Sequence, residues 1–240
     1  MTGLRWALGF LTILPVRPKG ELAPGDLGRA AGWFPLVGAA IGAALWLANR
    51  LLQPFVPPPL AAALVLALWV AASGALHLDG VADCCDGLLA SATPSRRLAI
   101  LADPHLGTFG AVGVVVLLLV KGAAIAGLAD PAALVLIPAA GRWIALLLAR
   151  GRPARPEGLG GRLHAELGAA PYLWALPIVA ASLLFGLRGP AALAAGLLAA
   201  WALGRLARAR MGGQTGDVLG AGIELSETAM LVALAVRLQP

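Results

Sequence analysis

The chain has 240 residues, of which 60% are hydrophobic and only 12% are charged. A soluble domain carries about 25% charged residues, so this composition excludes an ordinary soluble enzyme, a disordered chain and a coiled coil. The formal net charge of +6 does not indicate nucleic-acid binding, because basic loops beside an anionic leaflet give the same excess. We therefore expect a membrane protein that crosses the bilayer several times.

Long apolar runs rich in Ala, Leu, Val and Gly predict an all-α membrane bundle of about seven transmembrane helices, within a range of five to eight. An apolar N-terminal segment, about 4–16, is too short to span and is expected to lie at the interface or to re-enter. No soluble domain interrupts the runs, so residues 1–240 are expected to form a single integral membrane domain. The predicted spans, in chain order, are 30–52, 60–76, 109–128, 132–149, 172–187, 190–207 and 225–238.

Basic residues are distributed unequally between the segments that connect these spans. Thirteen Lys and Arg residues lie in alternate segments beginning at the N-terminus, and three lie in the segments between them. The positive-inside rule then predicts a cytoplasmic N-terminus. The long loops at about 77–108, 150–171 and 208–224 would face the cytoplasm, and the protein would lie in a bacterial inner membrane with its active site on that side.

Three aspartates lie on one predicted helix face in the first long loop. Asp79, Asp83 and Asp86 are spaced i, i+4 and i+7, within roughly 10 Å of helical rise. Carboxylates on one stripe repel one another and need a counter-charge, and oxygen-only ligands select a hard cation such as Mg²⁺. The alternative is a solvated helix face, which is less favoured because acids beside a span are costly and usually functional.

A second acidic stretch, 212–224, lies on the same predicted side of the membrane. Asp217 and Glu224 are again spaced i, i+7, and Thr215 is placed to cap the start of their helix. Glycines such as Gly213 allow a phosphate or a neighbouring backbone to approach closely. Two acidic helix faces that meet across a bundle indicate a one- or two-metal site for phosphoryl transfer near the cytoplasmic face.

Four further polar residues lie near these stretches or inside the spans. Lys121 and Arg142 lie mid-span, where they either pair with the acids or snorkel, or else clamp a diphosphate in a cavity sunk into the bundle. His77 and His105 flank the first acidic region, and each is expected to be a structural or substrate hydrogen-bonding group rather than a catalytic base.

At these residues the chain resembles the cobalamin synthase family, the membrane-bound adenosylcobinamide-GDP ribazoletransferases of bacteria and archaea. The resemblance covers nearly the whole chain, and two positions depart from it. Cys84 stands where Thr is common, and His105 stands where Arg is commoner, which puts a fixed cation at that point in doubt. The matching segments are 10–16, 34–38, 77–83 with 86–87, 106–110 and 212–224, together with the basic residues Lys121 and Arg142.

The resemblance implies a late step of cobalamin biosynthesis. Adenosylcobinamide-GDP and α-ribazole, or α-ribazole 5′-phosphate, would give adenosylcobalamin or its 5′-phosphate, with release of GMP and dependence on Mg²⁺. The expected metal ligands are Asp79, Asp83, Asp86, Asp217 and Glu224. The candidates for general base are Asp103 and Glu227, and the candidates for substrate binding are Lys121, Arg142, His77, His105, Gly213 and Thr215.

Two other functions stay open at this point. One is another Mg²⁺-dependent membrane phosphotransferase, such as a CDP-alcohol phosphatidyltransferase or a prenyltransferase, although the usual Asp motifs of those enzymes are absent. The other is a cation- or proton-coupled transporter, which would be expected to bury its acids near the midplane. The expected partners are the two substrates and the lipid bilayer, with no nucleic acid. A homo-oligomer and a complex of cobalamin-assembly enzymes remain alternatives.

Overall fold

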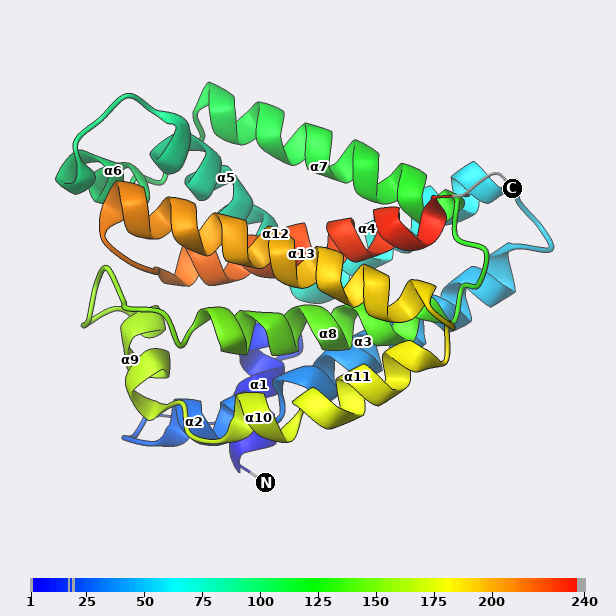
Figure 1. Ribbon diagram of the computed structural model, residues 1–240, viewed down its shortest axis with the longest axis horizontal. Helices are drawn as coiled ribbons and strands as arrows, with labels where there is room; N and C mark the ends of the chain where they lie inside the picture. The colour runs from blue at the N-terminus through cyan, green and yellow to red at the C-terminus, as the bar shows by residue number, and fades with distance from the viewer. Residues whose placement is uncertain (1, 17, 19, 237–240) are drawn as a thin grey trace.

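A computed structural model describes residues 2–16, 18 and 20–236. Its longer helices, such as α3, α7, α8, α12 and α13, lie roughly along one long axis and form a single bundle (Figure 1). Within the described residues there are no strands, and one isolated bridge joins Pro153 to Gln214. The helices are α1 (Thr2–Leu11), α2 (Asp26–Ala31), α3 (Phe34–Leu52), α4 (Pro58–Ser73), α5 (Leu76–Leu89), α6 (Pro94–Ile100), α7 (Thr108–Ala126), α8 (Ala133–Leu148), α9 (Leu159–Glu166), α10 (Ala170–Leu173), α11 (Ala175–Leu183), α12 (Arg188–Met211) and α13 (Gly216–Ala235).

The all-α membrane architecture predicted from the apolar runs is confirmed, with a helix in each predicted range. Four helices, α3, α7, α12 and α13, are long and apolar enough to cross a membrane unaided. The number rises to six if α4 with α5, and α9 with α10 and α11, each form one span, although the first pair is bent by 90° and the second by 72°. The remaining apolar helix, α8, has 16 residues and is shorter than a usual span.

The last span begins earlier than the hydropathy pattern predicts. Helix α13 starts at Gly216 rather than near 225, so the acidic stretch belongs to the helix and the predicted loop 208–224 shrinks to 212–215. The sequence already places the acids on a helix capped by Thr215, but hydropathy leaves them outside the apolar span because their charge lowers the mean hydropathy of the first turns. The predicted end of this span, at 238, lies outside the described residues, as do the basic residues Arg17, Lys19 and Arg237.

The three segments predicted to share one side of the membrane do lie at one end of the bundle. The connections after α5, α8 and α12 are all at the left of Figure 1, and those after α3, α7 and α11 are at the right. The N-terminal segment is also partly helical. Its helix α1 buries Trp6 and Leu11 against the other helices rather than lying free at an interface.

Small residues allow a close contact between α3 and α8. A Cβ atom at Gly38 would lie 2.4 Å from the carbonyl oxygen of Pro138, and one at Gly42 would lie 2.3 Å from that of Leu134. Helices α3 and α8 therefore touch backbone to backbone, as a small-xxx-small pair allows. The outer face of α7 instead exposes Val115 and Leu119, which fits contact with lipid acyl chains.

A sharp bend between α4 and α5 directs the first acidic helix across the bundle. The bend is made by two consecutive residues in the left-handed region, Gly74 at φ +61° and Ala75 at φ +58°. Alanine rarely adopts this conformation, which costs about 1–2 kcal/mol. The strain is held immediately before His77 and Asp79, so the bend fixes where these two side chains point.

The arrangement predicts opposite accessibility for the two ends of the bundle. Cysteine introduced at Glu157, after α8, and cysteine introduced at Phe55, after α3, should be labelled by a membrane-impermeant maleimide from opposite sides. The parental chain, whose Cys84 is buried and Cys85 half-buried, gives the background. Labelling of both positions from outside the cell would contradict the arrangement.

Candidate functional site

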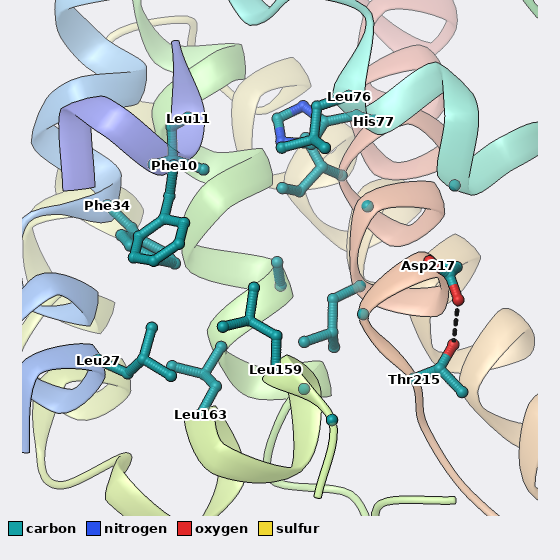
Figure 2. Close-up of a pocket in the computed structure, with 18 of the residues that line it drawn as sticks. Phe10, Leu11, Leu27, Phe34, Leu76, His77, Leu159, Leu163, Thr215 and Asp217 are labelled. Carbon is teal, nitrogen blue, oxygen red and sulfur yellow. Dashed lines mark hydrogen bonds between the residues drawn. The ribbon is translucent and has the colours of Figure 1, made fainter. Parts of the chain in front are cut away.

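A pocket lies at the end of the bundle where the long connections are located. It has a volume of about 350 Å³ and an apolar lining, with a small set of polar groups at its edge. Figure 2 shows Phe10, Leu27 and Phe34 on one side of the pocket, with Thr215 and Asp217 on the other. A concave apolar site with a few convergent polar groups is the usual form of a small-molecule site.

The polar edge is formed where α5 crosses α13. Asp79 from α5 and Asp217 from α13 both line the pocket. The two helices approach closely because a Cβ at Gly80 would lie 2.7 Å from the carbonyl oxygen of Asp217. On the facing helix, Gly220 packs against His77, whose Cα would be 3.5 Å from a Cβ built there. Two glycines thus bring the two predicted acidic faces together.

The start of α13 is organised by its cap. The Thr215 hydroxyl accepts a hydrogen bond from the Val218 backbone N–H at 3.3 Å, as the sequence predicts. It also donates to the Asp217 carboxylate at 3.2 Å, so the cap orients that carboxylate toward the pocket edge (Figure 2). Thr215 therefore lines the pocket and holds an acidic group at the same time.

The connection after α8 supplies the opposite side of this edge. Gln214 accepts from the Ala154 N–H and donates its own N–H to Arg152, both at 2.8 Å. A Cβ at Gly213 would lie 2.4 Å from the Arg152 carbonyl oxygen, so Gly213 serves backbone packing and does not line the pocket. This pairing places Arg155, which lines the pocket, where its charge acts on Asp217.

Two aspartates of the α5 stripe have no counter-charge close by. Asp79 is exposed and Asp83 is half-buried, and neither forms an ion pair or hydrogen bond to another side chain within the described part of the chain. No three His, Cys, Asp or Glu side chains converge closely enough to hold a metal ion among those same residues. Mg²⁺ does not require such a cage, because it commonly binds one or two carboxylates together with water and substrate phosphates.

The third aspartate of the stripe has a different task. One Asp86 carboxylate oxygen accepts from the Gly107 N–H at 2.8 Å, and the other accepts from the Gly110 N–H at 2.9 Å. These donors are the unpaired groups at the start of α7, so Asp86 caps that helix from a neighbouring one. Both of its oxygens are already engaged in joining α5 to α7.

Four charged side chains form a buried cluster deeper in the bundle. Lys121 of α7 donates to Glu224 and to Glu227 of α13, each at 2.7 Å, and Arg142 of α8 donates to the other Glu227 oxygen. All four are at most 5% exposed and their formal charges cancel. The Lys121 ammonium also lies 3.9 Å from the centroid of the Trp69 ring.

This cluster decides between the two interpretations of the mid-span cations. Lys121 and Arg142 are compensated by glutamates of the same chain, and neither lines the pocket. Glu224 lies with these cations rather than with the aspartates, and Glu227, a candidate general base, is fully buried between them. Glu224 follows Gly220 by one turn, about 6 Å further into the bundle.

The two histidines occupy unlike surroundings. His77 is buried and lines the pocket, and its Nδ1 has no hydrogen-bond partner among the described residues. His105 is exposed in the connection before α7, with its Nδ1 2.6 Å from Asp103. Hydrogen bonds from His105 hold the pKa of Asp103 below its ordinary value. Asp103 is thus an exposed, weakly basic carboxylate that does not line the pocket.

Two pocket features were not predicted from the sequence. In the sequence, Arg155 is one of several basic residues of a long loop, and neither it nor the glycines of 158–161 belongs to a predicted site, yet both line the pocket. A Cβ at Gly160 would lie 2.9 Å from the Gly216 N atom, so this run lets α9 approach the start of α13. Three glycines within four residues of a basic loop were the available signal.

Comparison with known proteins gives consistent matches over the whole chain. The sequence profile of a family described as cobalamin-5-phosphate synthase matches residues 3–235. A relative from Ectopseudomonas mendocina is 45% identical and covers 99% of this chain and 100% of its own length. Relatives from Pseudomonas aeruginosa, at 45% identity with 96% of each chain, and from Stutzerimonas stutzeri, at 43% with 99% of each, carry the same name, adenosylcobinamide-GDP ribazoletransferase. No solved structure matches significantly.

The buried cluster predicts that Glu227 is essential for stability. Glu227→Gln leaves Lys121 with one acidic partner and Arg142 with none among the described residues, and removing one partner of a buried pair costs about 3–5 kcal/mol. Glu224→Gln should cost less, because Lys121 keeps Glu227. Thermal unfolding of the purified variants in one detergent measures both. The exposed Glu157→Gln is the matched control, and a Glu227→Gln variant as stable as that control would refute the assignment.

Proposed function

The chain belongs to the cobalamin-5-phosphate synthase family, and we propose that its transfer site lies at the polar edge of the α5–α13 pocket. The reaction joins adenosylcobinamide-GDP to α-ribazole, or to α-ribazole 5′-phosphate, and releases GMP. The family match over residues 3–235 carries this assignment and favours it over another membrane phosphotransferase or a transporter. The pocket supports the location, because it brings two acidic helix faces to one opening.

The transfer needs a positioned nucleophile and compensation of negative charge on the leaving phosphate, and the polar edge of the pocket can supply both. A ribazole hydroxyl attacks the phosphorus that bears the cobinamide, a new P–O bond forms, and the bond to the GMP phosphate breaks. The attacking hydroxyl loses its proton, and the leaving phosphate gains negative charge. Positioning of the nucleophile and compensation of that charge are the usual sources of rate in such transfers.

The pocket residues divide these tasks. Arg155 is the cation at the edge, so we place the diphosphate between it and the start of α13. Asp79 and Asp217 are carboxylates at the same edge, close enough to accept or orient a hydroxyl proton. The apolar side formed by Phe10 and Phe34 suits a flat heteroaromatic base and keeps water from it. His77, with its free Nδ1, would hydrogen-bond the substrate from the floor of the pocket.

We propose Mg²⁺ as the cofactor, bound by one or two carboxylates among Asp79, Asp83 and Asp217 together with water and substrate phosphate, rather than by the full set predicted from the sequence. Glu224 is committed to Lys121 and Asp86 to the cap of α7, whereas Asp79 and Asp83 are oxygen donors without an ion pair to any described residue. Oxygen donors without a counter-ion fit a hard divalent cation. When bound, the ion would neutralise charge on the diphosphate.

The distribution of arginine residues indicates how the bundle is oriented in the membrane. We propose that the pocket end of the bundle faces the cytoplasm of an inner membrane, because the arginine-rich connection after α8 and the arginines in the last turns of α12 lie at that end. Both substrates are then taken from the cytoplasm. An assembly with a second copy or with other cobalamin-assembly enzymes stays a prediction.

Neutralising the aspartates of the proposed site should abolish transfer without unfolding the protein. Asp79→Asn, Asp83→Asn and Asp217→Asn each remove charge that the cation and the hydroxyl proton require, so we expect GMP release to fall on the order of 100-fold or more. Chelation of divalent ions should give the same loss, and added Mg²⁺ should restore the activity.

The matched control for these variants is Asp130→Asn, at the opposite end of the bundle. Asp130 is exposed, and among the described residues its side chain accepts a hydrogen bond only from the Ala132 N–H of its own turn. It should keep near-normal turnover. Near-normal turnover of an Asp79, Asp83 or Asp217 variant would remove that residue from the site, and activity in the presence of a chelator would remove Mg²⁺ from the proposal.

The helix contact at Gly80 predicts a second loss of activity that no charge change explains. Gly80→Ala forces α5 away from the Asp217 backbone, which a Cβ would approach to 2.7 Å. A displacement of about 1 Å between Asp79 and Asp217 can cost on the order of 100-fold in kcat/KM. Gly168→Ala, where a Cβ meets nothing within 4 Å, is the control. Equal turnover of the two variants would show that the α5–α13 spacing is not critical.

A further inference from the structure

A second groove runs along the outside of the bundle between α8 and α12. It has a volume of about 490 Å³ and is lined along most of its length by apolar side chains. Leu147 and Leu148 contribute from α8, and Leu197 and Ala200 contribute from α12. Figure 1 shows the two helices running along the same length of the bundle. An apolar groove on the side of a membrane bundle faces lipid rather than water.

The end of the groove nearest the pocket is basic. Arg205 and Arg208 of α12 line it, both side chains are exposed, and neither forms an ion pair with a described residue. Trp201, which is 61% exposed, lies one turn before Arg205, and the Arg205 guanidinium is 5.8 Å from the centroid of its ring. No acidic side chain is among the residues that line the groove in the described part of the chain.

The order of apolar, aromatic and basic side chains along the groove resembles the order of acyl chain and head group in a phospholipid. From Leu197 to Arg208 the helix rises about 16 Å, which is about half the hydrocarbon thickness of a bilayer. An apolar channel of that length accepts an acyl chain from one leaflet. The exposed Trp201 lies where an interfacial aromatic is expected, and the two arginines lie at head-group depth.

We propose that the α8–α12 groove binds an anionic phospholipid, with an acyl chain along Leu147, Leu197 and Ala200 and the head-group phosphate between Arg205 and Arg208. Charge complementarity selects an anionic lipid over a zwitterionic one, because no described acidic residue forms an ion pair with Arg205 or Arg208 or lines the groove. Guanidinium groups are well suited to this task, since they bind phosphate oxygens through paired hydrogen bonds.

The lipid site lies beside the transfer site and shares a connection with it. Gln214 lines the groove, and its Oε1 is buried without a hydrogen-bond partner among the described residues. The backbone of Gln214 pairs with Arg152 and Ala154, and the next residue, Thr215, caps α13 beside Asp217. A lipid that orders this short connection therefore also holds the pocket edge.

Lipid binding to the purified full-length protein tests the proposal directly. Native mass spectrometry of the detergent-solubilised chain, titrated with phosphatidylglycerol and separately with phosphatidylcholine, measures how tightly each lipid binds. We expect clear preference for phosphatidylglycerol. The double variant Arg205→Gln/Arg208→Gln should weaken phosphatidylglycerol binding about 30-fold and leave phosphatidylcholine binding unchanged.

The matched control is Arg188→Gln, which removes an exposed arginine from the opposite end of the same helix. It should keep the lipid preference. Equal binding of the two lipids by the parental chain, or unchanged phosphatidylglycerol binding by the double variant, would overturn the proposal. The proposal would also be overturned if millimolar inorganic phosphate displaced phosphatidylglycerol and if removal of the lipid's acyl chains did not weaken its binding. The site would then bind a free anion.

Because Arg205 and Arg208 do not line the transfer pocket, this test is independent of the proposed function. GMP release in nanodiscs with and without phosphatidylglycerol gives the second readout. If the shared connection transmits lipid binding, the anionic lipid should raise turnover of the parental chain and of Arg188→Gln, but not of the double variant. An equal response of all three chains would remove the link to the pocket.

Discussion

Pairing of charge inside an apolar bundle is the constraint on which the arrangement of this protein depends. A charged side chain in the hydrocarbon region costs several kcal/mol unless a partner compensates it. Lys121 and Arg142 meet that requirement with Glu224 and Glu227, and in doing so they join α7, α8 and α13 at one depth. The cluster thereby fixes the rotation of α13 about its axis. That rotation determines which face of its first turn, with Asp217, is turned toward α5.

The same constraint separates the acids that hold the structure together from those left for chemistry. Glu224 and Glu227 form ion pairs with Lys121 and Arg142, and Asp86 accepts hydrogen bonds from the backbone at the start of α7. Asp79 and Asp83 have no such partner within the described residues; Asp79 is exposed, Asp83 is half-buried, and both belong to the proposed site. An acidic stripe that looks uniform along the helix therefore contains two kinds of carboxylate, with different partners and different tasks.

The pocket and the lipid groove share one architectural device, which is the short connection between α12 and α13. It is pinned to the loop after α8 by the Gln214 backbone, and Gly212 at φ +83° reverses the chain where other residues would be strained. On one side this connection presents Thr215 and Asp217 to the pocket, and on the other it closes the groove at Gln214. The proposed transfer site and the proposed lipid groove therefore meet at one short connection.

The sequence by itself determined the features that depend on composition and local spacing. Hydropathy predicted the helical membrane class, the basic residues predicted which connections share an end, and Thr215 was recognised as a cap, because each depends on residues close together in the chain. Only the tertiary structure decided the partners of Lys121, Arg142, Asp86 and Arg155. Their contacts join helices up to 106 residues apart, as in the bond from Lys121 to Glu227. Periodicity shows which face of a helix is polar, but not which neighbouring helix that face will meet.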